Sequence, residues 1–177
     1  SEPSSVRFRV GAARALPGQL TAVPIYADVS GDAPIRTLLL NLSVQKVDGA
    51  ADVSQELAFV PHPLLGTPHL GRETSSEFVG AWLDPNHSGL SGNVQLGTLY
   101  IPIPTNATSS SAFQVHFSKA DASPNGVGIL PSTTEDCAII MSNRPSVGWN
   151  DGIPDAWRVQ YFGTLGDVSA ASDTDAD

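Results

Sequence analysis

Apolar and polar residues alternate along most of the chain up to Met141. Phe113, Val115 and Phe117, for example, are separated by Gln114 and His116. A period of two places every second side chain on the same face of a β-strand, so this pattern predicts strands with one face in a core and the other in water. The runs that show the pattern are residues 6–10, 23–29, 38–44, 57–59, 78–83, 94–103, 113–117 and 137–141.

One run changes phase in its middle. Val94 and Leu96 are in step with each other, whereas Leu99 and Ile101 are one residue out of step with them. One extra residue in a bulge shifts the alternation by one and would return both halves to the same face. We therefore expect one continuous strand here, with a β-bulge at Gly97.

Turn-forming residues separate the runs, and no helical period is present before residue 150. About nine short strands in roughly 140 residues are typical of two antiparallel sheets packed face to face. The sequence thus predicts an all-β fold, an antiparallel jelly-roll β-sandwich of about nine strands, followed by a short C-terminal helical segment.

Charge and cysteine content narrow the functional classes. The 177 residues carry a formal net charge of −9 and include only two lysines, Lys46 and Lys119. Nucleic-acid binding needs clustered basic residues, so this composition argues against a nucleic-acid partner. No apolar run approaches the roughly 20 residues that a membrane span requires. The single cysteine, Cys137, excludes an internal disulfide and a cysteine-based zinc site, and its alternation with Ile139 and Met141 predicts a buried position.

No combination of residues in the sequence indicates a catalytic centre. A serine hydrolase needs a nucleophile on a strained turn with a base in reach, and no such motif is present. Glu73 and Glu77 are better interpreted as solvated loop acids than as a glycosidase pair. The four histidines, His62, His69, His87 and His116, are scattered along the sequence. We interpret His62 and His69 as loop residues. We therefore predict that the protein is not an enzyme.

Trp82 has two interpretations. It shares a strand face with Phe78, which favours packing in the core. Exposed aromatic rings also stack on sugars, so Trp82 together with Tyr100 could instead form a carbohydrate platform. Core packing is the favoured interpretation, and carbohydrate binding stays open as an alternative function.

Two stretches of the sequence resemble cohesin domains. They are VRFRVGAARALPGQLTAVPIYADVSGDAPIRTLLLNLSV and GNVQLGTLYIPIPTNATSSSAFQVHF. The first has a strand, a Pro-Gly turn and a second strand containing VPI, and the second has LGTLYIPI, a polar loop and another alternating strand. Several carbohydrate-binding modules share much of this pattern. The resemblance implies a cohesin-like jelly-roll sandwich over residues 1–143, from a secreted bacterial protein whose relatives bind a partner module through a sheet face.

Residues 144–177 have a different pattern, which we interpret as a linker, a short helix and part of a calcium module. Pro154 suits the first turn of a helix, and Trp157 and Tyr161 would share one face of it. The strings NDGIPDAWRVQYFG and DTDAD resemble the calcium modules of dockerins and type-3 thrombospondin repeats. This resemblance implies calcium as a cofactor. Its ligands would be Asp151, Asp155, Asp173, Asp175 and Asp177.

Both calcium loops depart from the pattern of those modules. Val147 and Trp149 occupy positions of the first loop that usually carry acids. In the second loop, Asp173, Asp175 and Asp177 match positions 1, 3 and 5, and the sequence then ends before the expected glycine and twelfth-position acid. We interpret DTDAD as the first half of a calcium loop.

The 177-residue chain is accordingly expected to bind calcium only weakly. A cation would relieve the repulsion among the three carboxylates, but the turn glycine and the twelfth-position acid are absent. A chain extended by its native continuation should bind calcium more tightly by orders of magnitude. Calorimetric titration of both forms measures the difference. Equal affinities, or no binding by the extended form, would show that the tail is an ordinary acidic end.

The leading functional interpretation is non-enzymatic protein–protein attachment outside the cell, at a bacterial surface. The partner would be a dockerin-like module or another copy of the same chain. The alternative is a carbohydrate-binding module of a secreted, polysaccharide-associated protein. A passive spacer within a larger secreted protein is a third interpretation.

Overall fold

The structure is a computed structural model, and it describes residues 3–47, 53, 56–71, 76–107 and 112–141. These residues form eleven strands and contain no helix. The strands are β1 (Ser5–Val10), β2 (Arg14–Ala15), β3 (Leu20–Ser30), β4 (Thr37–Val47), β5 (Ala58–Pro61), β6 (His69–Leu70), β7 (Glu77–Trp82), β8 (Gly92–Pro102), β9 (Ala112–Ser123), β10 (Ser132–Glu135) and β11 (Cys137–Met141).

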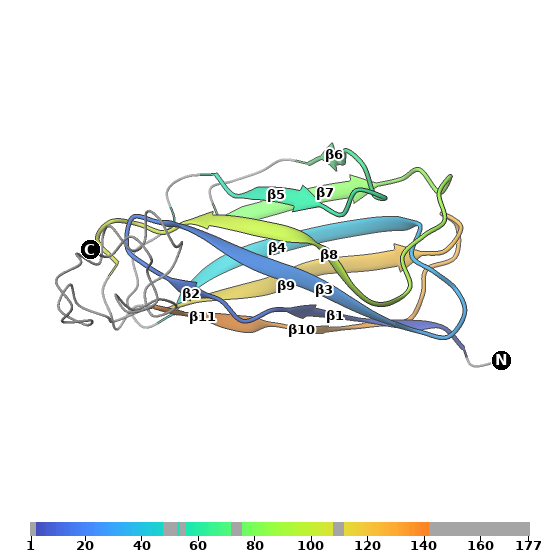
Figure 1. Cartoon of the computed structure of the whole chain (residues 1–177), viewed down its shortest axis with the longest axis horizontal. Coiled ribbons are helices and arrows are strands. Elements are labelled where there is room, and N and C mark those ends of the chain that lie inside the picture. The colour runs from blue at the N-terminus through green and yellow to red at the C-terminus, as the bar shows by residue number, and fades with distance from the viewer. Residues whose placement is uncertain (1–2, 48–52, 54–55, 72–75, 108–111, 142–177) are drawn as a thin grey trace, which may run out of the picture. The chain divides into compact units, whose positions relative to one another are not determined.

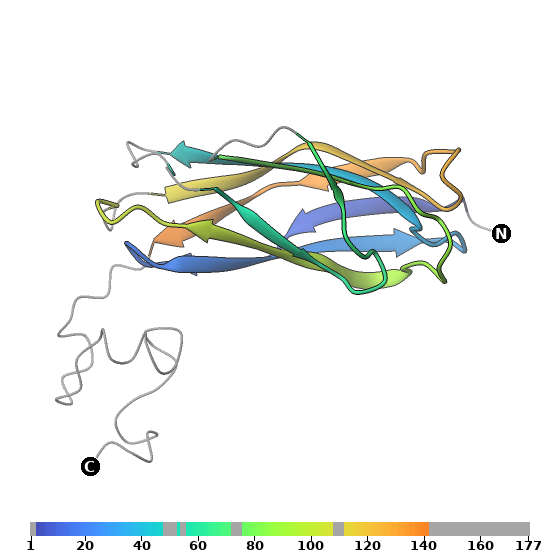
Figure 2. The same cartoon turned by 90° about the horizontal axis from the view of Figure 1, so that it is seen from above.

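The strands form two sheets stacked face to face, as Figures 1 and 2 show. The five-stranded sheet has the order β10-β1-β3-β8-β5, and the six-stranded sheet has the order β2-β11-β9-β4-β7-β6. The prediction of an all-β jelly-roll sandwich is confirmed. The chain divides into two units, Ser1–Met141 and Ser142–Asp177, and the second unit, with the predicted helix and the five aspartates, lies outside the described residues.

The predicted alternation places the apolar face of each long strand in one core between the sheets. Aromatic rings meet across this core: Phe8 of β1 lies 6.0 Å from Phe117 of β9, and Phe59 of β5 stacks on Phe78 of β7 at 5.0 Å. Burying such apolar surface is the main favourable term in folding. The largest fully buried side chains are Phe8, Phe113, Ile25, Ile35, Leu38, Leu40, Leu42, Leu96, Leu99, Ile101 and Ile139.

The predicted bulge in β8 is confirmed. Ile25 of β3 pairs with Gly97, and Tyr26 pairs with Gln95, so Leu96 is the extra residue. Leu96 and Leu99 are both fully buried, which shows that the bulge returns the second half of the strand to the core face. A second bulge, at Ser118 of β9, was not anticipated from the sequence.

Two parallel pairs interrupt the otherwise antiparallel sheets. β10 runs parallel to β1 in one sheet, and β11 runs parallel to β2 in the other. The chain therefore changes sheets at Asp136. Asp136 contacts β9 at this point with both carboxylate oxygens. Its Oδ1 accepts a hydrogen bond from Phe117 N at 3.0 Å, and its Oδ2 lies 2.6 Å from His116 Nδ1.

Candidate functional site

The outer surface of the six-stranded sheet, here called the six-stranded face, is largely uncharged. The strand register sets its side chains in rows, such as Ala81, Leu39 and Asp121 in one row and Val79 and Asn41 in the next. The outward residues of the four central strands are Leu39, Asn41, Ser43, Gln45, Glu77, Val79, Ala81, Gln114, His116, Lys119, Asp121, Ala138 and Ile140. Such a surface, low in charge and with small side chains, is compatible with close approach of another protein.

The few charged groups on this face lie mostly beside a partner of opposite sign. Lys119 Nζ is 3.9 Å from an oxygen of Asp121. Exposed ion pairs of this kind contribute little to stability. Between these charged groups, β4 presents the neutral side chains of Asn41 and Ser43.

One end of the six-stranded face carries a hollow of about 180 Å³. Apolar side chains that are unusually open to solvent border it: Leu83 is 57% exposed, Val127 87% and Ile129 65%. Exposed apolar patches of this kind mark interaction sites in many proteins. The residues that line the hollow are Thr37, Leu38, Leu39, Leu83, Asp121, Ala122, Ser123, Gly126, Val127 and Ile129.

The turn after β9 presents Val127 and Ile129 through its own hydrogen bonds. Asn125 Oδ1 accepts hydrogen bonds from the backbone N–H groups of Val127 and Gly128, at 2.9 and 3.0 Å. Gly126 has a φ of +81°, a conformation that glycine adopts without steric cost. The two apolar residues are thus held on a folded turn.

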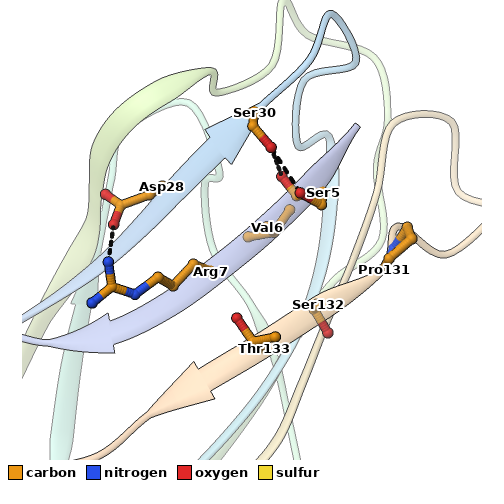
Figure 3. A pocket seen from close by; sticks show the side chains of 8 residues that line it. All are labelled: Ser5, Val6, Arg7, Asp28, Ser30, Pro131, Ser132 and Thr133. Atoms are coloured by element: carbon orange, nitrogen blue, oxygen red, sulfur yellow. Dashed lines mark hydrogen bonds and ion pairs between the residues drawn. The ribbon is translucent and has the colours of Figure 1, made fainter. Parts of the chain in front are cut away.

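The outer surface of the five-stranded sheet has a different character. A hollow of about 320 Å³, shown in Figure 3, is lined there by Arg7, Asp28, several hydroxyl-bearing side chains and Pro131. Asp28 Oδ2 accepts a hydrogen bond from Arg9 Nε at 2.9 Å, and this bond raises the pKa of Arg9. Arg7 is paired with Glu135. The charged groups of this face therefore bind one another.

The sequence-based interpretation of Trp82 as a core residue is confirmed, and the carbohydrate platform is wrong. Trp82 is only 2% exposed, and its Nε1–H donates a hydrogen bond to Gly66 O at 2.9 Å. Tyr100 belongs to β8 of the opposite sheet, so the two rings do not form one surface. Cys137 is only partly buried, although it packs against the core as predicted.

The other candidate residues are not brought into one site. Asp151, Asp155, Asp173, Asp175, Asp177 and Glu73 lie outside the described residues. Among the described residues, no group of three or more His, Cys, Asp or Glu side chains could hold a metal ion. No helix in the same part of the chain is long and apolar enough to cross a membrane.

The hollow was missed at the sequence level. Its signal was the run GVGIL, in which apolar residues lie in a glycine-rich turn where polar residues are usual. Leu39 was another signal, since it is a leucine at an outward position of an alternating strand.

Neither a scan against protein-family models nor a search of curated proteins gave a match. Solved structures do match. The CaDoc0917–CaCohA2 complex gives a TM-score of 0.61 at 17% identity, covering 77% of this chain and 99% of that chain. The solution structure of CaCohA2 from Clostridium acetobutylicum gives 0.56 at 17% identity, covering 78% of this chain and 91% of that chain.

A third match is the sixth cohesin of scaffoldin B from Acetivibrio cellulolyticus, solved in complex with a Cel5 dockerin. Its TM-score is 0.57 at 15% identity, and the aligned region covers 78% of this chain and 99% of that domain. Nearly the whole length of each of these domains is thus aligned with the sandwich. The described part of this chain has the cohesin fold.

Proposed function

We propose that this chain is a non-catalytic attachment module that binds a dockerin-type protein module through its six-stranded face. The observation that carries the proposal is the hollow bordered by the exposed apolar side chains of Leu83, Val127 and Ile129, at the end of a sheet surface with few charged groups. The matched sixth cohesin of scaffoldin B was solved in complex with a dockerin, which supports this class of partner.

The contrast between the two outer surfaces supports the choice of face. On the five-stranded sheet, Arg9 and Asp28 are already paired, so a partner would have to separate or desolvate these charges. On the six-stranded face, a partner would cover mostly neutral and apolar side chains, with the Lys119–Asp121 ion pair beside them. The hollow would receive an apolar side chain of the partner, and Asn41 and Ser43, farther along β4, would offer hydrogen bonds.

An attachment module of this kind fits the extracellular, bacterial-surface setting inferred from the sequence. Calcium binding by Asp151, Asp155, Asp173, Asp175 and Asp177 stays a prediction, tested by the titration described above. Self-association through the same face is a further outcome that the binding experiment below would detect.

The proposal predicts that Leu83→Asp strongly weakens partner binding. A new carboxylate would be desolvated in the complex in the same hollow as the carboxylate of Asp121, and the apolar contact would be lost. We expect affinity to fall about 30-fold or more, which is the effect of losing a binding hot spot. Isothermal titration of the full chain against a panel of dockerin modules of diverse sequence, and against the chain itself, measures it.

Val60→Asp provides a matched control on the opposite sheet. Val60 is 56% exposed, close to the 57% of Leu83, so both substitutions add the same charge to an equally open position. Val60→Asp should change affinity by less than about twofold, as expected for a residue outside the interface. Failure of every panel member to bind, or an equal loss with both variants, would contradict the proposal.

A further inference from the structure

Three connections that are far apart in the sequence meet beside the hollow. They are residues 31–36 between β3 and β4, residues 83–91 between β7 and β8, and residues 124–131 between β9 and β10. Figure 1 shows all three at the same end of the sandwich. The second connection carries Leu83 and the third carries Val127 and Ile129, so each supplies one wall of the hollow.

Arg36 links these two walls. Its Nε donates a hydrogen bond to His87 O at 2.9 Å, and its Nη1 donates one to Pro124 O at 3.0 Å. Its backbone N–H also donates to Ser123 O at 2.9 Å. Arg36 lies directly before β4, three positions from Leu39 on the floor of the hollow. One side chain therefore joins both walls to the floor.

His87 closes the arrangement from the other side. Its Nδ1 accepts a hydrogen bond from Gly89 N at 3.0 Å, so its Nε2 carries the proton and donates to Arg36 O at 2.8 Å. Arg36 and His87 thus bind each other's main-chain carbonyl oxygens. We call Arg36, His87 and the carbonyl of Pro124 the Arg36 clamp.

The guanidinium group suits this task because it is planar and offers several donors in a fixed fork. Hydrogen bonds from a charged donor are stronger than those between neutral groups. Both acceptors are carbonyls of connections, which are the parts of a sandwich with the fewest ladder hydrogen bonds. Among the hydrogen bonds of the described residues, the Arg36 side chain alone bonds both to residues 83–91 and to residues 124–131.

We propose that Arg36 is a positioning residue of the docking face, an inference that rests on the function proposed above. It fixes the two walls before the partner arrives, so that binding does not have to order them. Arg36 itself does not line the hollow and acts through Leu83, Val127 and Ile129. The shape of the hollow, and with it the choice of partner, depends on the clamp.

Arg36→Lys tests the clamp in the full chain without any partner. Lysine keeps the positive charge but cannot reproduce the two-acceptor fork. Amide hydrogen exchange at Gly89, Gly126 and Val127 should accelerate at least about tenfold, while exchange in the central β4 and β9 ladder stays unchanged. Arg9→Lys, which removes the guanidinium that donates to Asp28 on the opposite sheet, should leave the walls unchanged.

Three exchange results would overturn the clamp. They are no acceleration in the walls, acceleration in one wall only, and a uniform acceleration that includes the core strands. The last would show that Arg36→Lys lowers global stability without a specific effect on the hollow.

The role in docking is tested by the affinity of the same variants for the dockerin module that binds the wild-type chain most tightly in the panel. Arg36→Lys should weaken binding at least about tenfold, and Arg9→Lys by less than about twofold. Unchanged affinity with loosened walls would overturn the docking role. If no module binds the wild-type chain, the proposed function and the docking role fail together, whereas exchange still decides whether Arg36 holds the walls.

Discussion

Replacing Phe113 with alanine is expected to lower the free energy of unfolding by about 3–5 kcal/mol. Phe113 is fully buried on the inner face of β9, between Lys46 of β4 and Ile139 of β11 in the strand register. The substitution removes a whole aromatic ring and leaves a cavity that the two flanking strands cannot close. Urea denaturation followed by circular dichroism measures the loss.

Gln114→Ala is the natural control because it changes the next residue, which points away from the core. It should cost less than about 0.5 kcal/mol, as a surface substitution does. Phe117→Ala and Leu40→Ala should resemble Phe113→Ala, at about 2–5 kcal/mol, since both are buried in the same core. Equal effects of the Phe113 and Gln114 variants would contradict the assignment of inner and outer faces.

The long strands could be predicted because their sequence carries the period of two directly. In β3, for instance, Val23, Ile25 and Ala27 are fully buried, and the residues between them point outward. The bulge of β8 was predictable for the same reason, since a phase change has only a few structural explanations. These features depend on neighbours within a few positions.

The short strands had no such signal. β10 has the sequence STTE, which is polar and exposed throughout, and β2 consists of Arg14 and Ala15 alone. Each pairs in parallel with a strand distant in the sequence, β1 and β11 respectively. Their existence follows from tertiary pairing, which local propensity does not report.

The hollow and the Arg36 clamp also depend on contacts between residues that are far apart in the sequence, so local sequence patterns could not predict them. Arg36 is 51 residues from His87 and 88 residues from Pro124 along the chain. No local pattern marks Arg36 as different from the other arginines, and its hydrogen bonds go to main-chain oxygens that every residue possesses. The carbohydrate platform failed for a related reason, because sequence spacing does not show which sheet a strand joins.

Gly97→Ala is expected to lower the free energy of unfolding by about 1–3 kcal/mol, although it adds only a methyl group. A Cβ at this position would lie 2.5 Å from Phe59 Cζ and 2.5 Å from Val60 O. The carbonyl belongs to the paired backbone of β5. Phe59 is held by Phe78 at 5.0 Å and by Trp82 at 5.7 Å, so its ring has little room to move aside.

Gly128→Ala is the control that distinguishes the steric clash at Gly97 from the general effect of replacing a glycine with alanine. A Cβ on Gly128 meets nothing within 4 Å, and both substitutions restrict the unfolded chain to the same degree. Gly128→Ala should therefore be neutral or stabilising by up to about 1 kcal/mol. Thermal unfolding of the two variants measures the difference. Equal melting temperatures would mean that β5 can move away from β8 without cost, and that the bulge does not require a glycine.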